Sequence, residues 1–241
     1  MLTKVVLLCG RTARSSAYAQ ALVNAGLSPN AVIIYGDAPT ILTSQRSLEV
    51  QDLDALFCPD VRLDVLSIAH QHKWPLYQCK SKALDSEDMQ SALDALEPDL
   101  LIYSGYGGQL VPTSILSRCK VLHVHSGWLP DYRGSTTLYH EIVEHKQCAA
   151  SALFLDEHID TGPILMRQRY PIPPAGIDVD YLYDNAIRAD LLVKTLSRLL
   201  YASSSITPYS QDEDSLPYFI IHPLLKHLAL LAIDAEDPIN E

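Results

Sequence analysis

The first half of the chain alternates short apolar runs with longer segments whose apolar residues recur at helical spacing. Runs of strand length occupy residues 5–8, 31–35, 75–79, 100–103 and 120–124. Helical patterns or glycine stops mark residues 15–24 and 60–72, and acidic residues open another helix at residue 86. Residues 38–56 fit neither pattern. Strands spaced in this way predict an α/β fold with a mostly parallel twisted sheet flanked by helices.

The second half continues this pattern and then changes character after residue 201. Residues 149–155 and 164–170 read as two further strands, and residues 178–201 as an amphipathic helix with Asp178 as its N-cap. Residues 203–215 are polar and acidic, which is typical of a linker, and residues 218–221 and 223–233 predict a short strand and a closing helix. The chain therefore divides into a domain, residues 1–201, and a short extension, residues 202–241. The apolar part of this extension can contribute to a homodimer interface.

Two histidines and one aspartate are the strongest candidates for chemistry. His123 and His125 lie at the end of a predicted strand, and i, i+2 side chains of a strand share one face. In open parallel sheets, ligands bind beyond the carboxyl ends of the strands. Asp160 follows in a Gly/Pro turn. If that turn folds back beside the strand, imidazoles and a carboxylate meet, a combination suited to proton transfer or to metal binding.

Charge and composition narrow the classes of partner. The formal net charge is −11, and we see no cluster of Lys and Arg, which disfavours nucleic acid as a partner. No apolar run reaches the roughly 18 residues needed to span a bilayer, and the first residues lack the features of a secretory signal. The five cysteines are scattered, which is typical of reduced thiols. We therefore expect a cytoplasmic protein that acts on a small molecule.

Three segments, GYGGQLVP at 105–112, HSGWLPDYRG at 125–134 and DEHIDTGPIL at 156–165, resemble the folate-dependent formyltransferase family. This family includes glycinamide ribonucleotide, methionyl-tRNA and sugar N-formyltransferases. The segments follow the family's order and spacing, and the resemblance covers about residues 1–200. It implies a Rossmann-like core that transfers a formyl group from 10-formyltetrahydrofolate, a co-substrate, to an amine. The sugar N-formyltransferases look closest, because few residues follow residue 201 and these are acidic, so we expect a nucleotide-linked amino sugar as acceptor.

The resemblance also assigns roles to residues. The family's Asn-x-His pair and its Asp fall on His123, His125 and Asp160, with His123 in place of the Asn. His125 would donate to the oxyanion and relay a proton, Asp160 would orient His125 or accept the amine proton, and no metal is expected. The family's Thr corresponds to Ser151, and a second His of some members to Leu153.

The flanking loops supply the expected binding residues. Glycines let a ligand approach the backbone closely. The cofactor-binding candidates are Tyr106, Gly107, Gly108, Glu157 and Gly162, and the acceptor-binding candidates are Arg133 and Ser126. Arg133 could clamp an anionic group of the acceptor or brace its loop through an ion pair, and Tyr106 could bind the cofactor or only pack.

Other interpretations remain open at this level. The same site could deliver the formyl group to water, as a formyltetrahydrofolate hydrolase. His123, His125 and Asp160 could instead form the centre of a metal-dependent hydrolase. A binding protein that has lost catalysis with its Asn is a further alternative, and the two histidines could be core residues. We expect the remaining histidines of this region to face solvent: His140, His145 and His158.

Overall fold

A computed structural model describes residues 4–37, 42–50, 53, 56–201, 206–211 and 216–236. Parts of the ambiguous region 38–56 and of the expected linker, together with the last residues, lie outside the described residues. Among the described residues, no helix is both long and apolar enough to cross a membrane.

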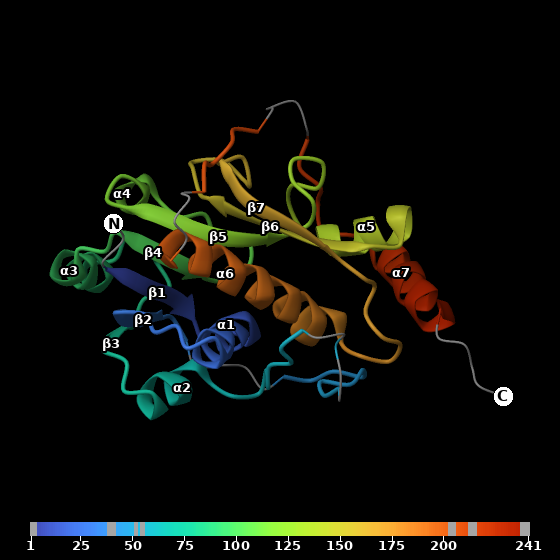
Figure 1. The fold of residues 1–241 in the computed structure, drawn as a ribbon, viewed down its shortest axis with the longest axis horizontal. Coiled ribbons are helices and arrows are strands. Elements are labelled where there is room, and N and C mark those ends of the chain that lie inside the picture. Colours follow the sequence, from blue (N-terminus) through green and yellow to red (C-terminus); the bar gives the residue numbers. More distant parts are fainter. Residues whose placement is uncertain are drawn as a thin grey trace.

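One seven-stranded sheet forms the centre of the fold, in the order β3-β2-β1-β4-β5-β6-β7 (Figure 1). The first five strands of the chain are parallel, whereas β6 and β7 run antiparallel to their neighbours. This confirms the predicted mostly parallel α/β sheet. The strands are β1 (Val5–Gly10), β2 (Ala31–Tyr35), β3 (Leu76–Cys79), β4 (Leu100–Ser104), β5 (Lys120–Ser126), β6 (Cys148–Phe154) and β7 (Ile164–Tyr170).

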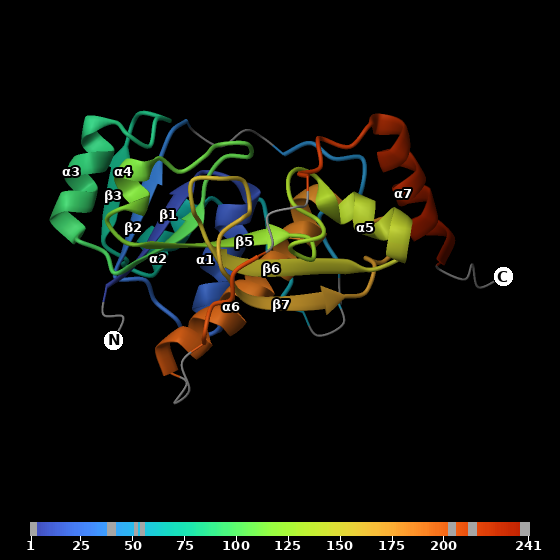
Figure 2. The same cartoon turned by 90° about the horizontal axis from the view of Figure 1, so that it is seen from above.

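Helices cover both faces of the sheet (Figure 2). Side chains of β1 alternate between two cores: Leu7 packs with the residues of α1, α2 and α6, and Leu8 packs with those of α3 and α4. Burial on both faces explains why β1, β2 and β4 consist almost entirely of apolar residues. The helices are α1 (Ala13–Asn24), α2 (Val65–Gln71), α3 (Glu87–Leu96), α4 (Thr113–Leu116) and α6 (Asp184–Tyr201).

Side chains cap the first turns of several helices, and two of these caps correct the residue at which the helix was predicted to begin. Thr12 accepts a hydrogen bond from the Ser15 backbone, so α1 begins before residue 15. Asp64 caps α2 by accepting from the Leu66 backbone, so that helix begins well after residue 60. The predicted cap Asp178 is confirmed, but it opens a π-helical turn, Val179–Tyr183, which precedes α6.

The C-terminal extension packs beside the end of β5. Helix α7 (Pro223–Glu236) contacts α5 (Thr137–His145), a helix that the sequence pattern does not indicate. The predicted strand at 218–221 is wrong: only Tyr218 makes a bridge, with Gly134. The Ile221 N–H donates instead to the Thr136 hydroxyl (2.8 Å), so the segment does not continue as a ladder.

Candidate active site

Strand β5 carries both histidines to the carboxyl edge of the sheet. His125 pairs with Ser151 of β6, and His123 pairs with Leu153, so the two imidazoles lie on one face of β5. The chain then leaves the sheet at Gly127, whose φ of 133° a side chain would disfavour. The Ser151 hydroxyl donates to the Gly127 carbonyl (2.6 Å) and accepts from the Leu129 backbone (3.0 Å). This hydroxyl therefore fixes the exit of the loop.

Asp160 lies in the turn that joins β6 to β7. Its φ is 54°, in the left-handed region that aspartate tolerates better than most residues. The Asp156 carboxylate accepts from the His158 backbone and from the Thr161 hydroxyl, at 3.0 and 2.7 Å. Gly162 closes the turn against β6, where an added Cβ would lie 1.8 Å from the Phe154 carbonyl oxygen. The turn is thus held in the shape that directs Asp160 back toward β5.

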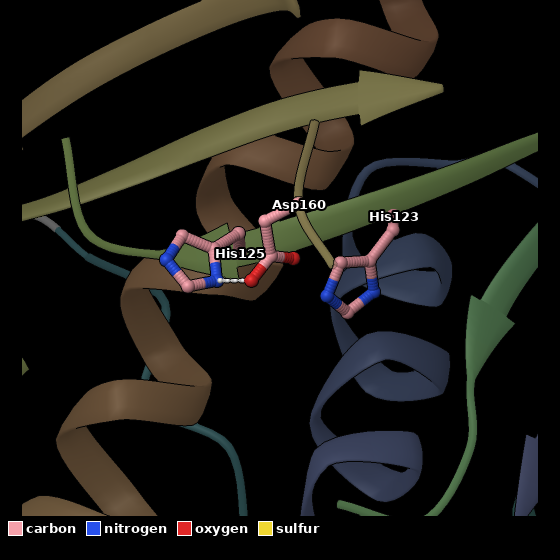
Figure 3. Close-up of side chains that lie close together, drawn as sticks. All are labelled: His123, His125 and Asp160. Atoms are coloured by element: carbon pink, nitrogen blue, oxygen red, sulfur yellow. Dashed lines mark ion pairs between the residues drawn. The ribbon is translucent and has the colours of Figure 1, made fainter. Parts of the chain in front are cut away.

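The structure brings His125 and Asp160 into contact. His125 Nδ1 lies 3.3 Å from Asp160 Oδ2, and both side chains are buried. The same carboxylate oxygen accepts from the Gly134 backbone N–H (3.1 Å). Figure 3 shows the Asp160 carboxylate between the two imidazoles, with the dashed contact to His125. Segments far apart in sequence therefore build one cluster.

The second nitrogen of His125 is already occupied. Nε2 lies 2.7 Å from the Tyr132 carbonyl oxygen, and 3.3 Å from the Thr137 hydroxyl. Burial lowers the pKa of His125, although the neighbouring Asp160 charge acts to raise it. His125 thus interacts with the protein at both ring nitrogens, and no ring nitrogen is left to donate directly to a substrate oxygen.

His123 lies next to this pair and is less enclosed. Its Nδ1 is buried and has no hydrogen-bond partner among the described residues. Burial lowers the pKa of His123 well below its ordinary value, and the positive charges of Arg14 and Arg188 lower it further. The imidazole is therefore neutral at neutral pH, with one ring nitrogen available to a ligand.

The two expected acceptor-binding residues do not join this cluster. The Arg133 side chain is 2% exposed and reaches Gln211 Oε1 from Nε at 3.4 Å and from a terminal nitrogen at 3.3 Å. Gln211 in turn donates to the backbone carbonyls of Asp160 (3.0 Å) and Gly162 (2.6 Å), so Arg133 braces the Asp160 turn. Ser126 follows His125 on β5 and faces the opposite side of the sheet, because successive side chains alternate.

The expected cofactor-binding residues form two neighbouring loops. Gly107 and Gly108 are exposed after β4, and an added Cβ at either would meet open space. Glu157 is exposed on the Asp160 turn and accepts from the Thr113 hydroxyl (3.2 Å), which ties this turn to the segment after the glycine loop. Tyr106 instead packs edge-on against Tyr35, with ring centroids 5.5 Å apart.

The sequence pattern missed several charged residues around the cluster. Glu141 is 1% exposed and accepts from the Trp128 backbone (3.3 Å), and burial raises its pKa to about 7. Arg188 donates to the Val124 carbonyl (2.9 Å) and pairs with Asp184, and Arg14 donates to the Gly105 carbonyl. Charged residues are seldom buried, so no pattern marks them in advance. The prediction that three nearby histidines face solvent is wrong for one of them. His145 and His158 are exposed, whereas His140 is half-buried.

Comparison with known proteins places this site in a family. The formyl transferase family model matches residues 3–192, most of the chain. The chain belongs to the formyl transferase family. A methionyl-tRNA formyltransferase from Synechococcus sp. (strain JA-3-3Ab) is 32% identical over 163 residues, which cover 66% of this chain and 48% of that protein. The chain spans about half the length of the curated relatives it matches.

Solved structures of the family share the fold of this formyl transferase chain. Phosphoribosylglycinamide formyltransferase from Streptococcus pneumoniae TIGR4 aligns with a TM-score of 0.55 and 19% identity, covering 83% of this chain and 99% of that chain. A sugar N-formyltransferase from Shewanella sp FDAARGOS_354 aligns with a TM-score of 0.55 and 16% identity, covering 95% and 87%. At these identities, the comparison supports the architecture of the sheet and its helices alone.

Proposed function

We propose that this protein transfers a formyl group from 10-formyltetrahydrofolate to a primary amine of a small molecule. The observation that carries the proposal is the buried contact between His125 Nδ1 and Asp160 Oδ2 at 3.3 Å. It joins a strand end to a distant turn at the sheet edge where α/β proteins bind ligands. Membership of the formyl transferase family supports the reaction class.

In this proposal the amine attacks the formyl carbon, and the carbonyl oxygen becomes an oxyanion in a tetrahedral intermediate. The amine loses a proton and the leaving folate nitrogen gains one. Asp160 accepts the amine proton and passes it to the leaving folate nitrogen, while a proton between His125 Nδ1 and Asp160 Oδ2 holds the carboxylate in place. His125 therefore acts as the partner of Asp160 rather than as the oxyanion donor.

The oxyanion donor in this proposal is His123, in the place of the family's Asn. A neutral imidazole carries one N–H, and Figure 3 shows Nε2 as the His123 nitrogen nearer the Asp160 carboxylate. A donor aimed at the developing oxyanion contributes about 2.7 to 4 kcal/mol to the stability of the transition state. His123 supplies this hydrogen bond when the proton of its ring lies on Nε2.

The folate would lie between the glycine loop and the Asp160 turn. The open space above Gly107 and Gly108 lets a flat ring approach the backbone, and Glu157 and Gly162 belong to the facing turn. Tyr106 contributes by shaping this loop, because its hydroxyl donates to the Tyr35 carbonyl (3.3 Å).

We infer that the acceptor is a nucleotide-linked amino sugar rather than a tRNA. A net charge of −11 opposes binding to a polyanion, since RNA-binding surfaces are basic. The fold neighbour from Shewanella is a sugar N-formyltransferase, whereas the curated relatives named above are methionyl-tRNA formyltransferases. The acceptor is therefore the part of the proposal that needs a direct assay.

The test uses the full chain with 10-formyltetrahydrofolate and a panel of nucleotide-linked amino sugars, with methionyl-tRNA as a separate arm. Tetrahydrofolate release is followed by absorbance and the formylated product by mass spectrometry. We expect release that depends on an amino sugar. Formylation of methionyl-tRNA alone would refute the acceptor class, and release without any acceptor would identify a hydrolase instead.

A further inference from the structure

The contact between His125 and Asp160 depends on a positive charge between its two atoms. A backbone carbonyl can only accept a hydrogen bond, so the 2.7 Å contact with Tyr132 requires the proton of a neutral His125 to sit on Nε2. Nδ1 then carries a lone pair, and it faces an Asp160 oxygen at 3.3 Å. Two acceptors face each other in a buried site unless a proton or a cation lies between them.

A third ring nitrogen adjoins the same space. Figure 3 shows that Nε2 of His123, not the buried Nδ1 that lacks a hydrogen-bond partner among the described residues, is nearer the Asp160 carboxylate. One ligand atom from each of His123, His125 and Asp160 lies within 4.8 Å of the others. Figure 3 shows the carboxylate flanked by the two rings, so all three atoms can turn toward one point.

We infer that His123, His125 and Asp160 bind one divalent zinc ion, with the fourth position open to solvent or to a ligand. Two imidazole nitrogens and one carboxylate oxygen are a common zinc ligand set. A zinc-bound histidine usually donates its other N–H to a backbone carbonyl or carboxylate, and Tyr132 already supplies this contact to His125. His123, in place of the family's Asn, provides the third ligand.

The geometry requires only side-chain movement. Zinc–nitrogen bonds are roughly 2.0 to 2.1 Å long, so tetrahedral ligand atoms lie about 3.3 Å apart. The His125–Asp160 distance already matches this value, and the His123 imidazole must approach the pair by at most about 1.5 Å. Half-buried His123 lies on the more open side of the cluster, and this is where the ion would enter.

Two arginines oppose a cation here and set a limit on the affinity. Arg14 and Arg188 both lie close enough to act on His123 electrostatically. The charge of Arg188 is offset by Asp184, 3.0 Å away, whereas the hydrogen bond of Arg14 goes to the uncharged carbonyl of Gly105. We therefore expect weaker zinc binding than at a structural site with four protein ligands. Bound zinc would occupy the His125 and Asp160 atoms that proton transfer uses, so the zinc form would be the inhibited form.

The test is titration of the metal-free full chain with zinc sulfate against a chromophoric chelator, which measures stoichiometry and affinity without any activity assay. The variants are His123→Asn and, as the matched control, His158→Asn, an exposed histidine on the Asp160 turn. We expect one zinc per wild-type chain, unchanged affinity in the control, and at least about tenfold weaker binding in His123→Asn. Equal zinc affinity in His123→Asn, or no stoichiometric binding by the wild type, would overturn the inference.

A second measurement keeps the inference testable if His123→Asn folds poorly. Cobalt(II) takes the place of zinc and reports its own coordination: a tetrahedral site gives intense visible absorption, and a surface-bound ion does not. We expect such a spectrum from the wild type at one equivalent of cobalt, and its loss when zinc is added. A weak visible spectrum, like that of a cobalt ion surrounded by six water molecules, would contradict the three-ligand site.

Discussion

Glu141 gives the account its most quantitative prediction, because this carboxyl is buried beside the loop that leaves β5. The perturbation is Glu141→Gln, which keeps the shape of the side chain and removes its ionisation. Burial raises the pKa of Glu141 from 4.5 to about 7, a difference of about 2.5 units. At about 1.36 kcal/mol per unit, ionisation of Glu141 costs the folded state about 3 kcal/mol. The side chain is only 1% exposed, so solvent screens little of this cost.

The sign follows from the protons bound in each state. Between pH 4.5 and 7 the unfolded chain has lost the Glu141 proton, whereas the folded chain keeps it. Wild-type stability therefore falls, relative to Glu141→Gln, as the pH rises through this window, and the difference is constant above it. Between pH 5 and pH 8, the stability of the variant relative to wild type should increase by about 2 to 3 kcal/mol.

Urea unfolding followed by circular dichroism at the two pH values measures this difference. Glu144→Gln is the control for the loss of one charge, because it removes an exposed carboxyl from the same helix. A Glu141→Gln difference that does not change with pH would refute the reasoning, since it would mean that the Glu141 carboxyl ionises as freely in the fold as in the unfolded chain.

Two further variants test how the site is held in shape. Gly162→Ala should lower the free energy of unfolding by at least about 2 kcal/mol, because the added methyl group would lie 1.8 Å from the Phe154 carbonyl oxygen. A urea midpoint equal to that of the wild type would contradict the close packing of the turn. Ser151→Ala should cost about 2 kcal/mol by leaving the Gly127 carbonyl and the Leu129 N–H unpaired, whereas Ser151→Thr should retain most of the stability. Equal losses in the two Ser151 variants would show that packing, not the hydroxyl, matters there.

The parallel part of the sheet could be predicted because burial leaves a direct mark on the sequence. Strands covered on both faces are continuous apolar runs, and β1, β2 and β4 are nearly so. Strand direction leaves no such mark, so the antiparallel course of β6 and β7 was not predictable from their composition. Helix α5 is short and mixes apolar with polar and charged residues, and in the structure it packs against β6 and α7.

The sequence indicated the residues of the candidate cluster but not their contacts. The spacing of His123 and His125 fixes a shared face, because strands alternate with a period of two. The meeting of His125 with Asp160 depends on the β5–β6 register and on the shape of a turn, and local sequence rules determine neither. The role of Arg133 was open for the same reason. Its position in the loop suggested that it binds an anionic group of the acceptor or that it stabilises the loop, and its contact with Gln211 favours the second role.

The central claim is that Asp160, held against His125, accepts the proton of the attacking amine. The most direct measurement is formyl transfer by metal-free Asp160→Asn, compared with wild type and with Asp131→Asn, an exposed carboxyl of the loop after β5. The account predicts that Asp160→Asn lowers turnover by about 10² to 10⁴ while the Asp131 control keeps wild-type turnover. Near-normal acceptor-dependent release of tetrahydrofolate by Asp160→Asn would contradict it.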